Sequence, residues 1–189
     1  MPRKIADLTW PKTTERLSLR PAELRDAAPT FAFRSRPDVA HWLTHLAQDA
    51  QAWEEGFGDR TDNTLIVEKD GVVIGDLYLH VQDPWSQAEV REQAAGTMAE
   101  IGYVLDPAHV GKGYATEAVT EELRICFEEI GVRRVIAQCF ADNEPSWRLM
   151  ERLGMRREQH TKKDSLHRNG EWLDGMMYAL LAEEWFSSR

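Results

Sequence analysis

The spacing of hydrophobic and polar residues predicts strands near both ends of the chain, with helices between them. Residues 16–20 alternate and stop at a proline, as a short strand does. Residues 64–68 and 72–81 predict two further strands, and Asp70-Gly71 between them favours a tight hairpin turn. Apolar residues at helical spacing predict a helix over residues 37–57.

The middle of the chain has the most regular pattern. Residues 100–105 alternate like a strand, residues 115–130 carry one apolar stripe at helical spacing, and residues 135–141 form another apolar run. The order is strand, glycine-containing loop, helix and strand, which predicts a βαβ-like unit of about 40 residues. The polar stretch 83–97 before it is expected to be a long surface loop with room for a helical turn.

The C-terminal part predicts a short helix and a second hairpin. Residues 145–153 begin with a proline, which suits the first turn of a helix. Residues 157–166 and 172–181 predict two strands around a turn at Asn169-Gly170. No repeat or flexible linker divides the chain, so residues 1–189 are expected to form a single domain of mixed α/β class.

Composition and charge narrow the class of protein. Of the 189 residues, 42% are hydrophobic and 29% are charged, the balance of a folded chain rather than a disordered one. The net charge of −9 argues against a nucleic-acid partner, because binding to phosphates requires clustered Lys and Arg. The same charge is compatible with a cationic acceptor such as an amine.

The sequence gives no sign of a membrane segment or of secretion. No apolar run approaches the roughly 20 residues that span a bilayer, and residues 1–10 lack the apolar stretch of a secretory signal. The two cysteines, Cys126 and Cys139, have no metal-ligand or disulfide-framework spacing. A reduced, cytoplasmic setting is therefore expected.

The glycine-containing loop is the first candidate for chemistry. It comprises Val110, Gly111, Lys112, Gly113, Tyr114, Ala115 and Thr116. Small residues let backbone N–H groups approach an anion, and a helix N-terminus adds positive potential, so a pyrophosphate would fit. The letters match neither a Walker loop, which needs Lys directly after the second glycine, nor a dinucleotide fingerprint, which needs a third glycine. An ordinary helix-start loop stays open as the alternative.

A second candidate segment follows the predicted βαβ unit. Asn143 and Ser146 stand at the start of the predicted helix 145–153, and Leu153-Gly154-Met155 stands at its end. Taken alone, Asn and Ser at this place are equally typical of helix caps.

Together the two segments resemble the GNAT superfamily of N-acetyltransferases. The run from Gly111 to Ala118 is similar to that family's pyrophosphate-binding loop, although Val110 stands where the family motif has Gln or Arg. Asn143 and Ser146 resemble the family's next motif, N-x-x-S. Residues 15–21 and 178–185 are similar to the branch that acetylates the N-termini of ribosomal proteins. The resemblance spans nearly the whole chain.

The resemblance implies a fold, a reaction and a set of contacts. The fold is a curved mixed sheet of about seven strands, with helices on both faces and two splayed central parallel strands. The reaction is transfer of the acetyl group of acetyl-CoA to a primary amine, by direct attack in a ternary complex. The residues implied in binding acetyl-CoA are Tyr103, Val104, Leu105, Val110, Gly111, Lys112, Gly113, Tyr114, Ala115, Thr116, Asn143, Ser146 and Arg148.

The reaction needs a base, because an α-amine has a pKa of about 7.7–8.0 and a Lys amine one of about 10.4. Glu100 is the first candidate, because Glu100-Ile-Gly-Tyr103 resembles the stretch in which some relatives place a catalytic glutamate. A surface strand carboxylate without a catalytic role is the open alternative. His80 and Asp76, on a neighbouring predicted strand, and Asp164 are lesser candidates.

Ser146 is the candidate donor to the thiolate leaving group. Many GNAT enzymes use a tyrosine seven residues after the Asn, but Met150 stands there and cannot donate a proton. The ribosomal branch uses the serine instead, so the resemblance assigns this role to Ser146. Asn143 is expected to contact the pantetheine arm. Cys139 is interpreted as a small buried thiol rather than an acyl carrier.

Other side chains are given no catalytic role. His41 and His45 have i, i+4 spacing, but Trp42 replaces the Glu of a zinc-protease motif, so no metal is expected. Trp85, in the predicted loop 83–97, is a candidate for the wall of an acceptor pocket.

The sequence leaves the acceptor open. A protein N-terminus and a small amine, such as a polyamine, an amino acid or an aminoglycoside-like antibiotic, are both compatible with the motifs. A non-catalytic acetyl-CoA sensor is a further alternative from a different class of protein. A monomer and a homodimer both stay open.

Overall fold

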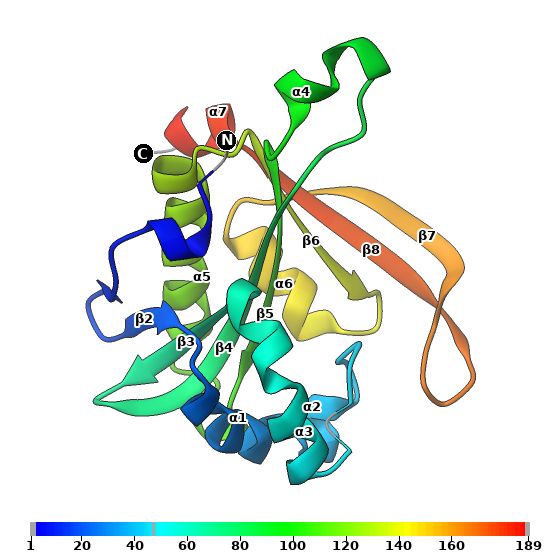
Figure 1. The fold of residues 1–189 in the computed structure, drawn as a ribbon. Helices are drawn as coiled ribbons and strands as arrows, with labels where there is room; N and C mark the ends of the chain where they lie inside the picture. The colour runs from blue at the N-terminus through cyan, green and yellow to red at the C-terminus, as the bar shows by residue number, and fades with distance from the viewer. Residues whose placement is uncertain (1–2, 47, 188–189) are drawn as a thin grey trace.

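One mixed, curved sheet of eight strands organises the computed structural model, which describes residues 3–46 and 48–187 (Figure 1). In sheet order the strands are β1 (Lys12–Thr13), β2 (Ser18–Pro21), β3 (Thr64–Lys69), β4 (Val72–Gln82), β5 (Met98–Leu105), β6 (Arg134–Phe140), β8 (Trp172–Leu181) and β7 (Arg156–Leu166). The sequence predicted about seven strands, and the additional one is the two-residue β1 at the sheet edge.

Helices lie on both faces of this sheet. They are α1 (Ala27–Arg34), α2 (Pro37–Ala40), α3 (Ala50–Phe57), α4 (Arg91–Ala94), α5 (Tyr114–Arg124), α6 (Glu144–Arg152) and α7 (Ala182–Ser187). Single 3-10 turns precede several of them, and α5 continues as a π-helical segment over Ile125–Ile130. Among the described residues, no helix combines the length and apolarity that crossing a bilayer requires.

Strand β3 shows how the two faces are covered. Leu65 and Val67 belong to the larger apolar cluster, which includes the buried residues of α5 and α6. Ile66, between them, belongs to a second cluster with Trp53 and Phe57 of α3. Because successive strand residues point to opposite faces, α5 and α6 cover one face and α1 and α3 the other.

Strands β5 and β6 run parallel and pair over only three positions, from Met98–Arg134 to Glu100–Ile136. All other neighbouring strands are antiparallel, and β5 stays paired with β4 along its whole length. Within the part of the chain that the structure describes, residues of β5 after Glu100 therefore have no partner strand on the β6 side, and the sheet opens there. We call this opening the split; it confirms the expected splayed pair of parallel strands.

Most predicted elements are confirmed. The turn at Asp70 and Gly71 has φ values of 52° and 78°, as the first hairpin requires, and the loop 83–97 contains the one-turn α4. The predicted helix 115–130 is present as α5 and its π-helical extension, ending at Gly131 with φ 83°.

The single helix predicted over residues 37–57 is wrong. The structure has α2 and α3 instead, because Trp42 leaves the helical path to pack 6.1 Å from the Phe140 ring. Asp49 then starts α3 by accepting a hydrogen bond of 2.8 Å from Ala52 N–H. The prediction of one domain over residues 1–189 includes residues 1, 2, 47, 188 and 189, which lie outside the described residues.

Candidate active site

The backbone of β5 offers unpaired hydrogen-bonding groups to the split. At one end Thr97 O accepts from Arg133 N–H, and at the other Asp106 N–H donates to Ile74 O, both at 2.8 Å. Since successive residues of a strand direct their N–H and C=O groups to opposite sides, odd-numbered residues of β5 face β6. Beyond the last paired position these are Ile101, Tyr103 and Leu105, whereas the groups of Val104 face β4.

Glu100 stands on β5 at the point where the split begins. Its Oε1 accepts a hydrogen bond of 3.3 Å from Gln138 Nε2 of β6. On the other side it lies directly opposite His80 of β4 in the strand register. The Tyr78 ring stacks on His80 with 6.1 Å between ring centroids, and burial together with the Glu100 charge raises the pKa of Tyr78. These four side chains gather a carboxylate, an imidazole, an amide and a neutral phenol on one sheet face.

Tyr103 and Ser146 meet on the opposite face. The Tyr103 hydroxyl lies 3.0 Å from Ser146 Oγ and donates to Ser146 O at 2.9 Å. Burial raises the pKa of Tyr103, so its hydroxyl stays protonated. The contact joins β5 to α6, and it places two hydroxyl groups beside the split.

Cys139 of β6 neighbours this pair. Burial raises the pKa of Cys139 to about 11, although a hydrogen bond with Ser146 opposes the rise. A thiol with that pKa is protonated at neutral pH and is a poor nucleophile. This agrees with the interpretation of Cys139 as a structural thiol.

The glycine-containing loop has the backbone conformation that an anion site needs. Gly111 and Gly113 have φ values of 80° and 83°, a region that other residues rarely adopt. Gly113 is the N-cap of α5 and provides no side-chain cap, and Glu117 N–H makes the bond back to Gly113 O at 3.1 Å. The N–H groups of Tyr114, Ala115 and Thr116 occupy the first turn, where a helix lacks internal acceptors.

An arginine distant in the sequence supports this loop. The sequence alone did not point to this arginine. Arg16 Nη1 donates to Lys112 O at 3.0 Å, and its guanidinium lies 4.6 Å from the Tyr114 ring centre. Glu117 holds Arg16 by accepting from its Nε at 2.7 Å. Burial raises the pKa of Glu117, but bonds from Thr14 and Arg16 outweigh it and leave the pKa below its usual value. The pairing spans 101 positions, so no local pattern could have shown it.

Two charged residues of the predicted set point elsewhere. Lys112 Nζ donates to Ala108 O at 3.0 Å, and Arg148 pairs with Glu144 one helical turn away. Val110 is 61% exposed and offers the loop no charge. Among the described residues, the Asn143 side chain makes no cap bond to α6, which leaves its amide available for a ligand.

A cavity of about 640 Å³ opens on the sheet face that carries Tyr78. Its apolar and aromatic walls come largely from α3, and its charged groups come from α1, β4 and the segment before β3. Its lining includes Arg34, His45, Trp53, Phe57, Asp59, Arg60, Asp76 and Tyr78. Since Tyr78 lies opposite Gly102 in the strand register, the cavity adjoins the part of β5 that borders the split.

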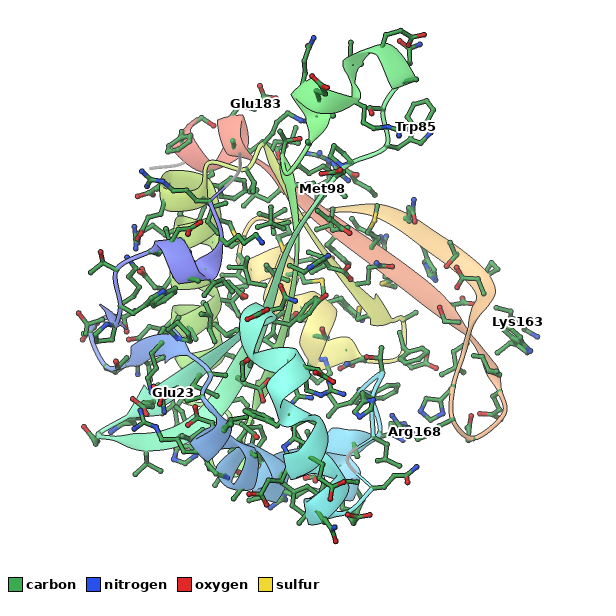
Figure 2. The ribbon with its side chains drawn as sticks, in the orientation of Figure 1. Glu23, Trp85, Met98, Lys163, Arg168 and Glu183 are labelled. Carbon is green, nitrogen blue, oxygen red and sulfur yellow. The ribbon has the colours of Figure 1, made fainter. Side chains whose placement is uncertain are left out.

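The lesser candidates are placed differently. Asp76 is buried and held by Arg34, which donates from Nε at 2.7 Å and from Nη2 at 2.5 Å. Hydrogen bonds from Thr161 and Ser165 lower the pKa of Asp164, which makes it a weak base. Trp85 is 94% exposed, points outward beyond the end of β4 (Figure 2) and does not line the cavity.

The β7–β8 hairpin holds the segment between α2 and α3. His167 Nε2 donates to His41 O at 2.8 Å, and Arg168, at the hairpin turn (Figure 2), donates to Leu43 O. We call residues 41–46 the strap. It carries His45 and Leu46 to the rim of the cavity.

The comparisons with known proteins agree with this geometry. Residues 16–156 match the family model described as an acetyltransferase (GNAT) domain. The crystal structure of a GNAT-family acetyltransferase from Bacillus anthracis is 31% identical, with a TM-score of 0.79 over 93% of this chain and 100% of that one. The chain therefore belongs to the GNAT family of N-acetyltransferases, as the motifs indicated.

Two curated relatives carry names that state an acceptor. The putative ribosomal N-acetyltransferase YdaF of Bacillus subtilis is 26% identical, covering 92% of this chain and 96% of its own length. The L-amino acid N-acetyltransferase AaaT of Escherichia coli is 28% identical, covering 85% of this chain and 95% of its own length. Membership of the family makes this chain an acetyl-CoA-dependent N-acetyltransferase, and the two relatives differ in acceptor.

Proposed function

We propose that this chain moves the acetyl group of acetyl-CoA directly to a primary amine in a ternary complex, with Glu100 as the base. The observation that carries the proposal is the position of Glu100, at the last paired residue of β5 where the split begins. There its carboxylate faces the cavity side of the sheet, while the hydroxyls of Tyr103 and Ser146 lie on the other side.

Acetyl-CoA fits the residues present. The pyrophosphate would bind at the N-terminus of α5, where Gly111 and Gly113 let a ligand approach the backbone closely. The pantetheine would lie in the split, bonded to backbone groups of Tyr103 and Leu105 and to the Asn143 amide. Arg148 and Lys112 are assigned only to the rim, because each already has a partner within the chain.

The chain's own residues would divide the proton transfers between the two faces. Glu100 would take the proton from the attacking amine, directly or through one water, with Gln138 fixing its carboxylate. Ser146 would donate a hydrogen bond to the departing sulfur, and Tyr103 would hold that hydroxyl in place. A positioned donor where negative charge develops lowers the barrier more than one that must reorient.

The proposal extends to domain organisation, cellular location and oligomeric state. We propose a single domain over the whole chain, active in the cytoplasm as a monomer or homodimer. The two cysteines are unpaired in the structure, and one of them, Cys126, is fully buried in the apolar cluster. Both features suit a reducing compartment.

The test is release of thiol from acetyl-CoA with a panel of peptides, amino acids, polyamines and aminoglycosides. Glu100→Gln should lower kcat by about 10²–10⁴-fold, with binding of coenzyme A, measured by calorimetry, unchanged. Glu92→Gln, an exposed carboxylate on α4, is the matched control and should keep full activity. Activity of Glu100→Gln within threefold of the parent would move the base to another group, and His80 would be tested next.

A further inference from the structure

The cavity beside Tyr78 contains a cation without a carboxylate partner. Among the described residues, no acidic oxygen lies within 4 Å of the Arg60 guanidinium, since no ion pair includes it. The guanidinium instead lies 5.0 Å from the centre of the Trp53 ring. Burial and the nearby Arg34 charge lower the pKa of Arg60, and the charges of Asp76 and Asp59 oppose this without outweighing it.

No other charged residue that the structure describes in the cavity forms an ion pair with Arg60. Asp76 is already held by two bonds from Arg34, so this pair is internally balanced. Asp59 is exposed and forms no ion pair with Arg60. Burial and the surrounding arginines lower the pKa of His45, which leaves its ring neutral at pH 7. The formal charges that line the cavity balance, Arg34 and Arg60 against Asp59 and Asp76, but of these four described residues only Arg34 and Asp76 form an ion pair, so Arg60 is the cation left to bind a ligand carboxylate.

The rest of the cavity suits an apolar group. Trp53 and Phe57 of α3 line it, and Leu46 of the strap contributes to its lining as well. A volume of about 640 Å³ falls in the range of small-molecule pockets, about 300–1,000 Å³. Apolar and aromatic walls with a few placed polar or charged groups are the usual form of a site that orients a small ligand.

We propose that this cavity binds the carboxylate of an amino-acid acceptor through Arg60, with the acceptor's side chain against Trp53 and Phe57. The inference rests on the proposed function, because it takes the amine of this acceptor as the group that Glu100 deprotonates. Tyr78 connects the two ends: it lines the cavity and stands two residues from His80, which is opposite Glu100. Two residues along a strand span about 7 Å, so a small molecule bound in the cavity can extend from Tyr78 to Glu100.

The same charges disfavour a polyamine. A polyamine has no carboxylate for Arg60, and its second ammonium group would lie near Arg60 and Arg34 in a partly desolvated space. The net charge of −9 is compatible with a cationic acceptor, but it describes the whole chain, whereas the cation without an ion-pair partner among the described residues of the cavity is Arg60.

The experiment compares amino acids with their amides. The acceptors are the twenty L-amino acids, β-alanine and 4-aminobutyrate, the C-terminal amides of the best substrates, and spermidine. The proteins are the parent, Arg60→Gln, Arg60→Lys and the control Arg91→Gln, which removes an exposed cation on α4 far from the cavity. Thiol release gives kcat and KM for each acceptor and for acetyl-CoA.

We expect at least one amino acid to be a substrate and its amide to have a KM at least tenfold higher. Arg60→Gln should raise KM for the amino acid at least tenfold, leave KM for acetyl-CoA unchanged and leave the amide unaffected. Arg60→Lys should restore part of the affinity, and Arg91→Gln should match the parent. The inference would be overturned if the amino acid and its amide had equal KM values, or if Arg60→Gln left KM for the amino acid unchanged. Either result would leave the acetyltransferase mechanism intact.

A binding measurement separates this inference from the catalytic proposal. Thermal shift of the parent and Arg60→Gln is recorded with each amino acid and amide, with coenzyme A present and no acetyl donor. Binding of an amino acid that Arg60→Gln abolishes, without turnover of any amine, would support the carboxylate site and refute the catalytic proposal. Turnover of an amine without Arg60-dependent binding would support the catalytic proposal and refute the carboxylate site.

Discussion

The hydroxyls of Tyr103 and Ser146 lie 3.0 Å apart and join β5 to α6 beside the split. Tyr103 also donates to the backbone carbonyl of Ser146, so one phenol fixes both the main chain and the side chain of that residue. Met150, seven positions after Asn143, is buried in the core. The phenol beside Ser146 is thus supplied by a strand rather than by the helix α6.

The first prediction concerns this pair. Ser146→Ala and Tyr103→Phe should each lower kcat by about tenfold, because each removes one hydroxyl from the sulfur side. The double variant should be no slower than the worse single variant, since the two hydroxyls act as one unit. Full additivity of the two losses, measured as log kcat at saturating substrates, would show that the groups act separately.

The second prediction concerns Glu122 of α5. It is fully buried, and neither of its carboxylate oxygens has a hydrogen-bond partner among the described residues. Burial, with a smaller effect of the Asp76 charge, raises the pKa of Glu122 well above its usual value. Glu122→Leu should therefore stabilise the protein by about 1–3 kcal/mol at pH 7, measured by urea unfolding.

The same side chain predicts a pH dependence with a definite sign. Because the folded state holds this proton more tightly than the unfolded state, the carboxyl destabilises the fold increasingly as pH rises above its unfolded pKa. The gain from Glu122→Leu should accordingly be small near pH 4 and larger at pH 7. Glu122→Gln, which keeps a buried polar group, is the control and should gain less. A loss of stability in Glu122→Leu at pH 7 would show that the carboxyl has a partner after all.

The third prediction concerns the ion pair of Arg34 and Asp76. Both side chains are largely buried, so Arg34→Met would leave the Asp76 carboxylate desolvated without a partner. This should cost about 3–5 kcal/mol in unfolding free energy. Adding Asp76→Asn should recover part of the loss, because the second change removes the unpaired charge. The check is a double-mutant cycle, in which denaturant unfolding gives the unfolding free energies of the parent, Arg34→Met, Asp76→Asn and the double variant.

The fourth prediction concerns Glu117 and the loop that it supports. Glu117→Gln should release Arg16 from its carboxylate and raise KM for acetyl-CoA several-fold, because Arg16 holds Lys112 O. Since the folded pKa of Glu117 is lowered, its contribution to stability is present above its unfolded pKa and is lost as pH falls through the folded value. The parent and variant should therefore converge in melting temperature at low pH and differ at pH 7.

The fifth prediction uses two glycines with the same backbone conformation. Gly113 and Gly131 both have φ 83°, so an alanine at either costs about 1–2 kcal/mol of strain. A Cβ at Gly113 would also lie 3.3 Å from Arg16 Nη2, whereas none would touch anything at Gly131. Gly113→Ala should weaken coenzyme A binding in calorimetry, and Gly131→Ala should lower stability alone. Equal affinity in both variants would place the pyrophosphate elsewhere.

Much of the fold could be predicted because its signals are local. The turn at Asp70-Gly71, the βαβ-like unit and the loop glycines each depend on a few neighbouring residues. The break between α2 and α3 could not be predicted, since it depends on Trp42 packing against Phe140, a residue almost a hundred positions away in the sequence. The proposed role of Arg60 could not be predicted either, because it depends on the folded surroundings of its guanidinium, which has no ion-pair partner among the described residues.

The predicted site divides along the same line. Motifs were enough to propose Glu100 and Ser146 as candidates. The hydroxyl partner of Ser146 and the Gln138 bond to Glu100 follow instead from the way β5, β6 and α6 converge. The alternation of β5 also distinguishes between neighbouring residues that the resemblance had placed together in the binding site. It turns the backbone groups of Leu105 to the split and those of Val104 to β4.

The strap is attached in a way that bears on how this enzyme could change its acceptor over time. Both anchors from the β7–β8 hairpin, His167 and Arg168, bind carbonyl oxygens of the strap rather than its side chains. Every amino acid has that carbonyl, so substitutions in the strap would keep both attachments. Mutation can therefore reshape the rim of the cavity without detaching it, and a new specificity could arise there before any residue of the reaction centre has altered.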